Sequence, residues 1–264
     1  MAYDIISKLS DPTIASKVEL ITYLIKRAEE QRSNEEFKGS ISTYLSEREK
    51  FPYLGSYCLI GPKYALGCLV GHFLYHYVSE KDLRKQINVL VSLLNYVKGF
   101  QPSENPLLKK IAVIKLINIL EQFGIPEYFL KTPNNRPLRI YHIPYQHADA
   151  NAGYYPHLNS IVSYRPREAD LDPEYIFLHE VGHLFTFALT GDPGGVPDSF
   201  IEFNTRFNPK WKGDLIEVFV DLFSMAVMMD TAYASKNPFI KTFPVGKQNI
   251  VRDYFIKLVK GLGL

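Results

Sequence analysis

Two histidines and a glutamate in the second half of the chain have the types and spacing needed for metal-dependent hydrolysis. In the segment YIFLHEVGHLF they form the pattern H-E-x-x-H, with His179, Glu180 and His183. Residues four apart lie on the same face of a helix, with Cβ atoms about 5–6 Å apart, so both imidazoles can reach one Zn²⁺. Glu180 follows the first histidine directly, where its carboxylate can meet a water on the metal without being a ligand.

The residues around this motif predict a helix that is buried on most sides. Asp172 can cap its first turn, Pro173 suits the first helical position, and Gly191 supplies a stop. Apolar residues surround the motif. A buried helix that carries two histidines by coincidence is the alternative, but the cap and the apolar setting favour a metal site.

A catalytic zinc site needs three protein ligands, so a third residue must be found. No histidine follows His183, which leaves an acid. Glu217 is the best candidate, because it lies in the apolar stretch DLIEVFVDLFSMAV, where a carboxylate is costly unless it is paired or bound to metal. Asp221 lies one turn later and can orient a ligand histidine through its other ring nitrogen. Alternatively, both acids form the solvent-facing stripe of an amphipathic helix.

Composition and charge argue against several other classes of protein. The 264 residues allow one large or two small domains, and a net charge of +2 without a basic block argues against nucleic-acid binding. Cys58 and Cys68 are too few for a disulfide framework. The N-terminus lacks the pattern of a signal peptide, and the apolar run Tyr64–Val78 is too short to span a bilayer. We therefore expect a cytoplasmic protein that binds neither nucleic acid nor membrane, with non-classical export left open.

Residues 1–130 are expected to form a mostly helical N-terminal region. Pro62–Val78 reads as a buried helix, and Leu107–Phe123 reads as a further helix before the composition changes. His72 and His76 in the first of these also lie four apart. No acid follows the first of them, so we interpret them as a core or partly exposed histidine pair rather than a metal site.

Residues 131–264 are expected to form the catalytic domain. Pro137–Tyr145 has the alternation of a strand, and Gly153–Tyr155 with Ile161–Tyr164 predicts a hairpin just before the active helix. An edge strand there can pair with an extended substrate, although an ordinary surface hairpin is equally compatible with the pattern. Gly191–Gly213 reads as a long loop and Gly246–Val259 as a last helix. The expected fold class is therefore α+β, with a small mixed sheet and an active-site helix.

Three segments of the chain, in this order, resemble a known family: GYYPHLNSIVSY, LHEVGHLF and EVFVDLFSMAV. They resemble the gluzincins, and more closely the family of the anthrax lethal factor catalytic domain and the Pro-Pro endopeptidases. The resemblance implies a zincin-like metallopeptidase domain that cleaves peptide bonds in extended substrates. It also implies one Zn²⁺ per chain held by His179, His183 and Glu217, with Glu180 as the base.

The chain departs from this family at one functional position. The family has a tyrosine a few residues before the ligand glutamate, where it can stabilise the oxyanion, but residues 208–214 contain none. The candidates for oxyanion or substrate contacts are Tyr154, Tyr155, Tyr164 and Tyr233. We expect a zinc-dependent peptidase, and the departure leaves open a zincin-like binding or regulatory module that does not catalyse.

Overall fold

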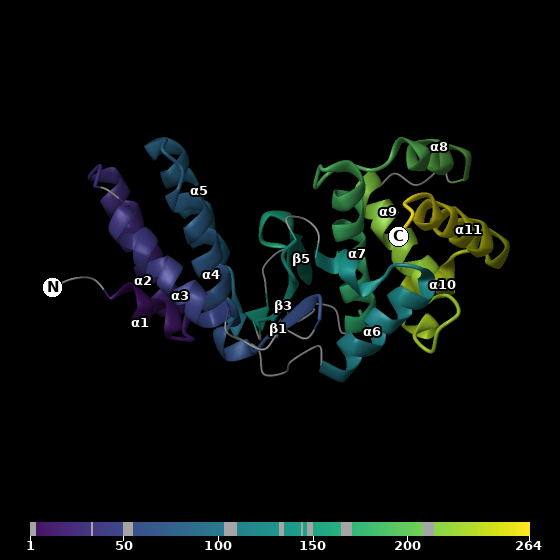
Figure 1. Cartoon of the computed structure of the whole chain (residues 1–264), viewed down its shortest axis with the longest axis horizontal. Helices are drawn as coiled ribbons and strands as arrows, with labels where there is room; N and C mark the ends of the chain where they lie inside the picture. The colour runs from purple at the N-terminus through teal and green to yellow at the C-terminus, as the bar shows by residue number, and fades with distance from the viewer. Residues whose placement is uncertain are drawn as a thin grey trace. The chain divides into compact units, whose positions relative to one another are not determined.

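The computed structural model describes residues 4–32, 34–49, 55–102, 110–131, 135–143, 145–146, 150–164, 171–207 and 214–264. The fold is α+β, as predicted, and it is mostly helical with a small four-stranded mixed sheet (Figure 1). The chain forms two compact units. The first unit comprises Met1–Pro52, Ile60–Asn105 and Tyr141–Asp149, and the second comprises Tyr53–Leu59, Pro106–Ile140 and Ala150–Leu264.

The first unit is built mainly from helices and a short ribbon. Its helices are α1 (Ile5–Ser10), α2 (Ile14–Glu29), α3 (Glu35–Glu49), α4 (Pro62–Val78) and α5 (Leu83–Lys98), and the ribbon pairs β2 (Gln101–Pro102) with β4 (Tyr145–Gln146). Asp82 caps α5 by accepting hydrogen bonds from two backbone N–H groups. α5 buries Leu90, Leu93 and Val97 along one face and packs against α2. The helix predicted over Pro62–Val78 is confirmed as α4.

A buried lysine binds backbone carbonyl groups at the C-terminal end of α1. Lys17 on α2 is fully buried, and its ammonium donates to the backbone oxygen of Lys8, 2.9 Å away, and to that of Asp11. The Tyr44 hydroxyl donates to the backbone oxygen of Leu9 at 3.3 Å. These donors satisfy carbonyl groups that a helix leaves unpaired at its C-terminus. Burial lowers the pKa of Lys17 to about 8, although the nearby Asp11 carboxylate acts in the opposite direction.

Replacing Lys17 by methionine is expected to change how stability varies with pH. The pKa of Lys17 is about 8 in the folded chain and has the ordinary value of 10.5 when unfolded. Between these values the unfolded chain binds more protons, so the wild type gains stability as the pH rises. From about pH 7.5 to about pH 9.5 it should gain about 2 kcal/mol relative to Lys17→Met, as measured by urea unfolding. The exposed Lys26→Met is the matched control, and parallel pH curves for Lys17→Met and wild type would contradict the expectation.

Among the described residues, the sheet of the second unit has the strand order β1-β3-β6-β5, in which β5 is at an edge. Its strands are β1 (Tyr57–Ile60), β3 (Leu138–His142), β5 (Ala152–Tyr155) and β6 (Ser160–Ser163). β5 and β6 pair antiparallel with Tyr154 opposite Ile161, which confirms the predicted hairpin. Asn159 follows the short turn η2 (Pro156–Leu158) in the left-handed conformation, which asparagine tolerates. Its side-chain amide donates to two backbone carbonyls, at 2.8 and 2.7 Å.

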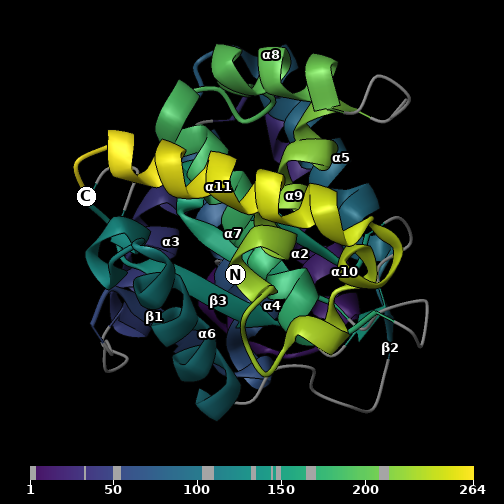
Figure 2. The ribbon, with the colours of Figure 1, turned by 90° about the vertical axis from the view of Figure 1, so that its right-hand side faces the viewer.

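Helices enclose the apolar core of the second unit. They are α6 (Lys110–Phe123), α7 (Pro173–Thr190), α8 (Asp198–Phe207), α9 (Leu215–Met228), α10 (Pro238–Thr242) and α11 (Val245–Gly261), with the short turns η1 (Glu127–Lys131) and η3 (Ala234–Lys236). α7 packs against α9, and α11 lies across α9 (Figure 2). A Cβ atom on Gly182 of α7 would lie 2.9 Å from the Val220 Cβ atom, so glycine permits this close approach.

The prediction of a long loop over Gly191–Gly213 is wrong, because α8 lies inside it. The glycines and prolines at the start of the segment obscured a helical pattern that follows them. Phe200, Phe203 and Phe207 recur at helical spacing, and the Phe200 ring packs on that of Phe219 at 4.8 Å between centroids. Burial of this apolar face, rather than local helix propensity, stabilises α8. Residues 208–213 lie outside the described part of the chain.

Membrane-spanning helices are not found in the described ranges. None of the helices there is both long enough and apolar enough to cross a bilayer.

Candidate metal centre

The H-E-x-x-H motif lies on α7, which belongs to the second unit. α7 begins at Pro173 and ends before Gly191, which has φ 72, so both boundary predictions are confirmed. Asp172 is at the N-cap but makes no side-chain capping hydrogen bond. The imidazoles of His179 and His183 lie on one face of the helix with their ring centroids 5.1 Å apart. The helical period alone produces this proximity.

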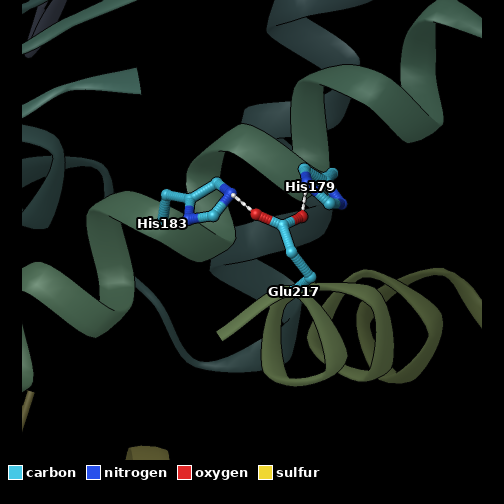
Figure 3. Close-up of side chains that lie close together, drawn as sticks. All are labelled: His179, His183 and Glu217. Carbon is cyan, nitrogen blue, oxygen red and sulfur yellow. Dashed lines mark ion pairs between the residues drawn. The ribbon is translucent and has the colours of Figure 1, made fainter. Parts of the chain in front are cut away.

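Glu217 comes from the first turn of α9 and lies between the two imidazoles (Figure 3). One carboxylate oxygen is 3.2 Å from His179 Nε2, and the other is 3.6 Å from His183 Nε2. The Glu217 side chain is 52% exposed, whereas the two histidine side chains are 17% and 18% exposed. The packing of α7 on α9 thus brings the third predicted ligand to the other two.

The separations between these side chains suit a zinc ion. Zinc bonds to nitrogen and oxygen of about 2.0–2.2 Å place the ligand atoms of a tetrahedral site about 3.3–3.6 Å apart. One ligand atom from each of His179, His183 and Glu217 lies within 4.8 Å of the others. Within the described residues, these three form the cluster of side chains that could hold a metal ion. The cluster can therefore hold a metal ion.

Asp221 orients one of the imidazoles. His179 Nδ1 lies 2.9 Å from Asp221 Oδ1, one turn along α9 from Glu217. When Nδ1 donates its proton to this carboxylate, the lone pair of Nε2 points to the space shared with Glu217 and His183. This is the arrangement in which an outer carboxylate fixes the tautomer and raises the basicity of a ligand histidine.

The two histidines have opposite pKa shifts. Burial lowers the pKa of His179, but its hydrogen bonds with Asp221 and Glu217 outweigh burial and raise it to about 10. Burial and the neighbouring His179 lower the pKa of His183 to about 4. The hydrogen bond with His179 lowers the pKa of Glu217. The carboxylates of Asp221 and Glu217 therefore favour a positive charge at His179. A metal cation bound between these side chains can take the place of the proton and balance the same negative charges.

Glu180 is buried beside this cluster and is suited to proton transfer. Its residue is 6% exposed, and burial raises the pKa of its carboxyl group to about 7. The charge of Glu217 also raises this pKa, while His179 and a hydrogen bond from the backbone N–H of Tyr154 lower it. A carboxyl group with a pKa near neutrality can accept a proton and return it at physiological pH.

The four candidate tyrosines differ in their surroundings. The hydroxyls of Tyr155 and Tyr164 lie 3.2 Å apart, and burial and the Glu180 charge raise the pKa of both. The Tyr154 hydroxyl instead donates to Asn159 Oδ1 at 3.2 Å. The ring of Tyr233 lies under the Lys236 ammonium, 5.4 Å from its centroid. Tyr155 and Tyr164 are thus the pair whose electrostatic surroundings include Glu180.

One residue of the site, Tyr175, was not among the residues predicted from the sequence, although it begins the segment YIFLHEVGHLF. The hydroxyl of Tyr175 donates to Asp221 Oδ1 at 2.7 Å. Tyr175, His179 and His183 are spaced four apart, so the helical period already placed the tyrosine on the ligand face. The sequence could not show that Asp221 would be within reach.

The second pair of histidines with a spacing of four, His72 and His76, is not part of the candidate metal centre. His72 on α4 is buried and His76 is half-buried. Among the described residues neither joins a group of three ligating side chains.

Comparisons with known protein families, with curated proteins and with solved structures found no match for this chain. The resemblance carried by the three sequence segments therefore remains an expectation.

Proposed function

We propose that the protein is a zinc-dependent peptidase and that its second unit is a zincin-like catalytic domain. The observation that carries the proposal is the convergence of three ligand side chains beside a buried acid that is not a ligand. His179, His183 and Glu217 supply the donors, and Glu180 lies next to them on α7. Two histidines with one acid leave a coordination position for water, which is the ligand set of a catalytic zinc rather than a structural one.

The roles of the side chains follow from their chemistry. A zinc ion held here would lower the pKa of a bound water and polarise the scissile carbonyl. Glu180 would take the proton of the attacking water and return it to the leaving amine, and its pKa of about 7 suits both transfers. Asp221 would keep the His179 ring in the orientation and tautomer that a ligand needs.

The edge of the sheet supports an extended peptide as the substrate. β5 has a sheet neighbour on one side, and it packs against α7. An extended chain can add to such an edge through backbone hydrogen bonds. The backbone N–H of Tyr154 in this strand donates a hydrogen bond to Glu180. A peptide bound along β5 would therefore lie near the Glu180 carboxylate.

Tyr155 is our candidate for stabilising the oxyanion in place of the tyrosine that the family has before its ligand glutamate. Its hydroxyl is held by the buried Tyr164 at 3.2 Å. Burial and the charge of Glu180 keep the pKa of Tyr155 above its ordinary value, so the hydroxyl stays protonated and can donate to a developing negative charge.

Metal content and peptide cleavage together test the proposal. Purified wild type is expected to contain about one zinc ion per chain and to cleave members of a broad peptide library. A zinc chelator should abolish cleavage, and added zinc should restore it. Zinc at one ion per chain without any cleavage would favour the non-catalytic binding module. A folded chain that neither contains nor takes up zinc would overturn the metal site itself.

A further inference from the structure

Tyr175 and His179 meet at a single oxygen of Asp221. The Tyr175 hydroxyl is 2.7 Å from Asp221 Oδ1, and His179 Nδ1 is 2.9 Å from the same atom. Tyr175 is 7% exposed and the Asp221 side chain is 15% exposed. Hydrogen bonds to a carboxylate that is largely withdrawn from water are stronger than neutral ones, so both donors restrict its rotation.

A segment after α9 holds Tyr175 in place. Phe239 of α10 packs against the Tyr175 ring at 6.1 Å between centroids. Lys236 binds Glu174, the residue before Tyr175, at 2.5 Å. Asn237, which is fully buried, anchors this segment by donating to Ser224 on α9 and capping α10. This segment therefore contacts both Tyr175 and the residue before it.

We propose that Tyr175 is a positioning residue of the metal centre. Its hydroxyl holds the Asp221 carboxylate against His179 Nδ1, so that His179 presents Nε2 to a zinc ion shared with His183 and Glu217. The inference rests on the metal site of the proposed function, but it does not require that the protein hydrolyse peptides.

The test is the zinc affinity of Tyr175→Phe, which removes the hydroxyl and keeps the ring. Competition with a chelator should show a dissociation constant for zinc about 10-fold higher than in wild type, at the lower end of the effects of outer-shell partners. The absorption spectrum of the cobalt-substituted protein should shift, because the His179 ring becomes less constrained. Tyr254→Phe is the matched control, since the Tyr254 hydroxyl bonds Ser199 at 3.0 Å outside this network.

A double-mutant cycle separates positioning from general stability. Asp221→Asn alone should weaken zinc binding by about 10–100-fold. Adding Tyr175→Phe to Asp221→Asn should weaken it little further, because the tyrosine acts through Asp221. Wild-type zinc affinity and an unchanged cobalt spectrum in Tyr175→Phe would overturn the proposal, as would full additivity in the cycle.

Metal binding is measured without substrate, which separates this inference from the proposed activity. A wild type that binds zinc and cleaves nothing would end the peptidase proposal and leave the role of Tyr175 to be decided by the affinities. A wild type that does not bind zinc would overturn both.

Discussion

Replacing Glu180 by glutamine is expected to abolish peptide cleavage while zinc stays bound. Glutamine has nearly the same shape, and its side-chain oxygen can still accept the hydrogen bond that the Tyr154 N–H gives Glu180. It cannot take a proton from water, so the rate should fall by about 10²–10⁴-fold, the usual contribution of a general base. The measurement is the cleavage rate of a peptide selected from the library, with zinc content determined on the same sample.

The control for this experiment is Glu202→Gln, the same change at an exposed position on α8. It should leave both cleavage and zinc content unchanged. Full activity of Glu180→Gln would contradict the mechanism, and loss of zinc from this variant would mean that Glu180 is itself a ligand.

Replacing Glu217 by alanine is expected to remove the zinc. Glu217 is the acid that reaches both imidazoles, at 3.2 and 3.6 Å, and alanine leaves two protein ligands. The loss of affinity should exceed the range of about 10–100-fold that is typical of outer-shell partners. Elemental analysis after dialysis should find little zinc in Glu217→Ala and in His179→Ala, and about one zinc ion per chain in wild type.

Glu202→Ala provides the matched control, and circular dichroism should show that the variants keep their helical content. If His179→Ala loses zinc but Glu217→Ala keeps it, the third ligand is a different acid. Asp221 would then be the next residue to test, because it also contacts His179.

The sequence by itself determined the features that depend on local geometry. Pro173 and Gly191 mark the ends of α7, and the helical period puts His179 and His183 on one face whatever the rest of the chain does. The hairpin before α7 follows from two short strand-like runs on either side of a turn. The apolar surroundings of Asp221, whose side chain is 15% exposed, also indicated an acid with a specific partner, because an unpaired buried carboxylate is costly. The same argument does not hold for Glu217, because its side chain is 52% exposed.

Only the tertiary structure decided how these pieces meet. The packing of α7 on α9 sets the distances from Glu217 to the two imidazoles and brings the Tyr175 hydroxyl to Asp221. The helix α8, predicted as a loop, exists because its phenylalanines bury against the core. Such contacts join residues far apart in the chain and depend on how whole helices pack. Local patterns can therefore identify the donors of the site but not their convergence.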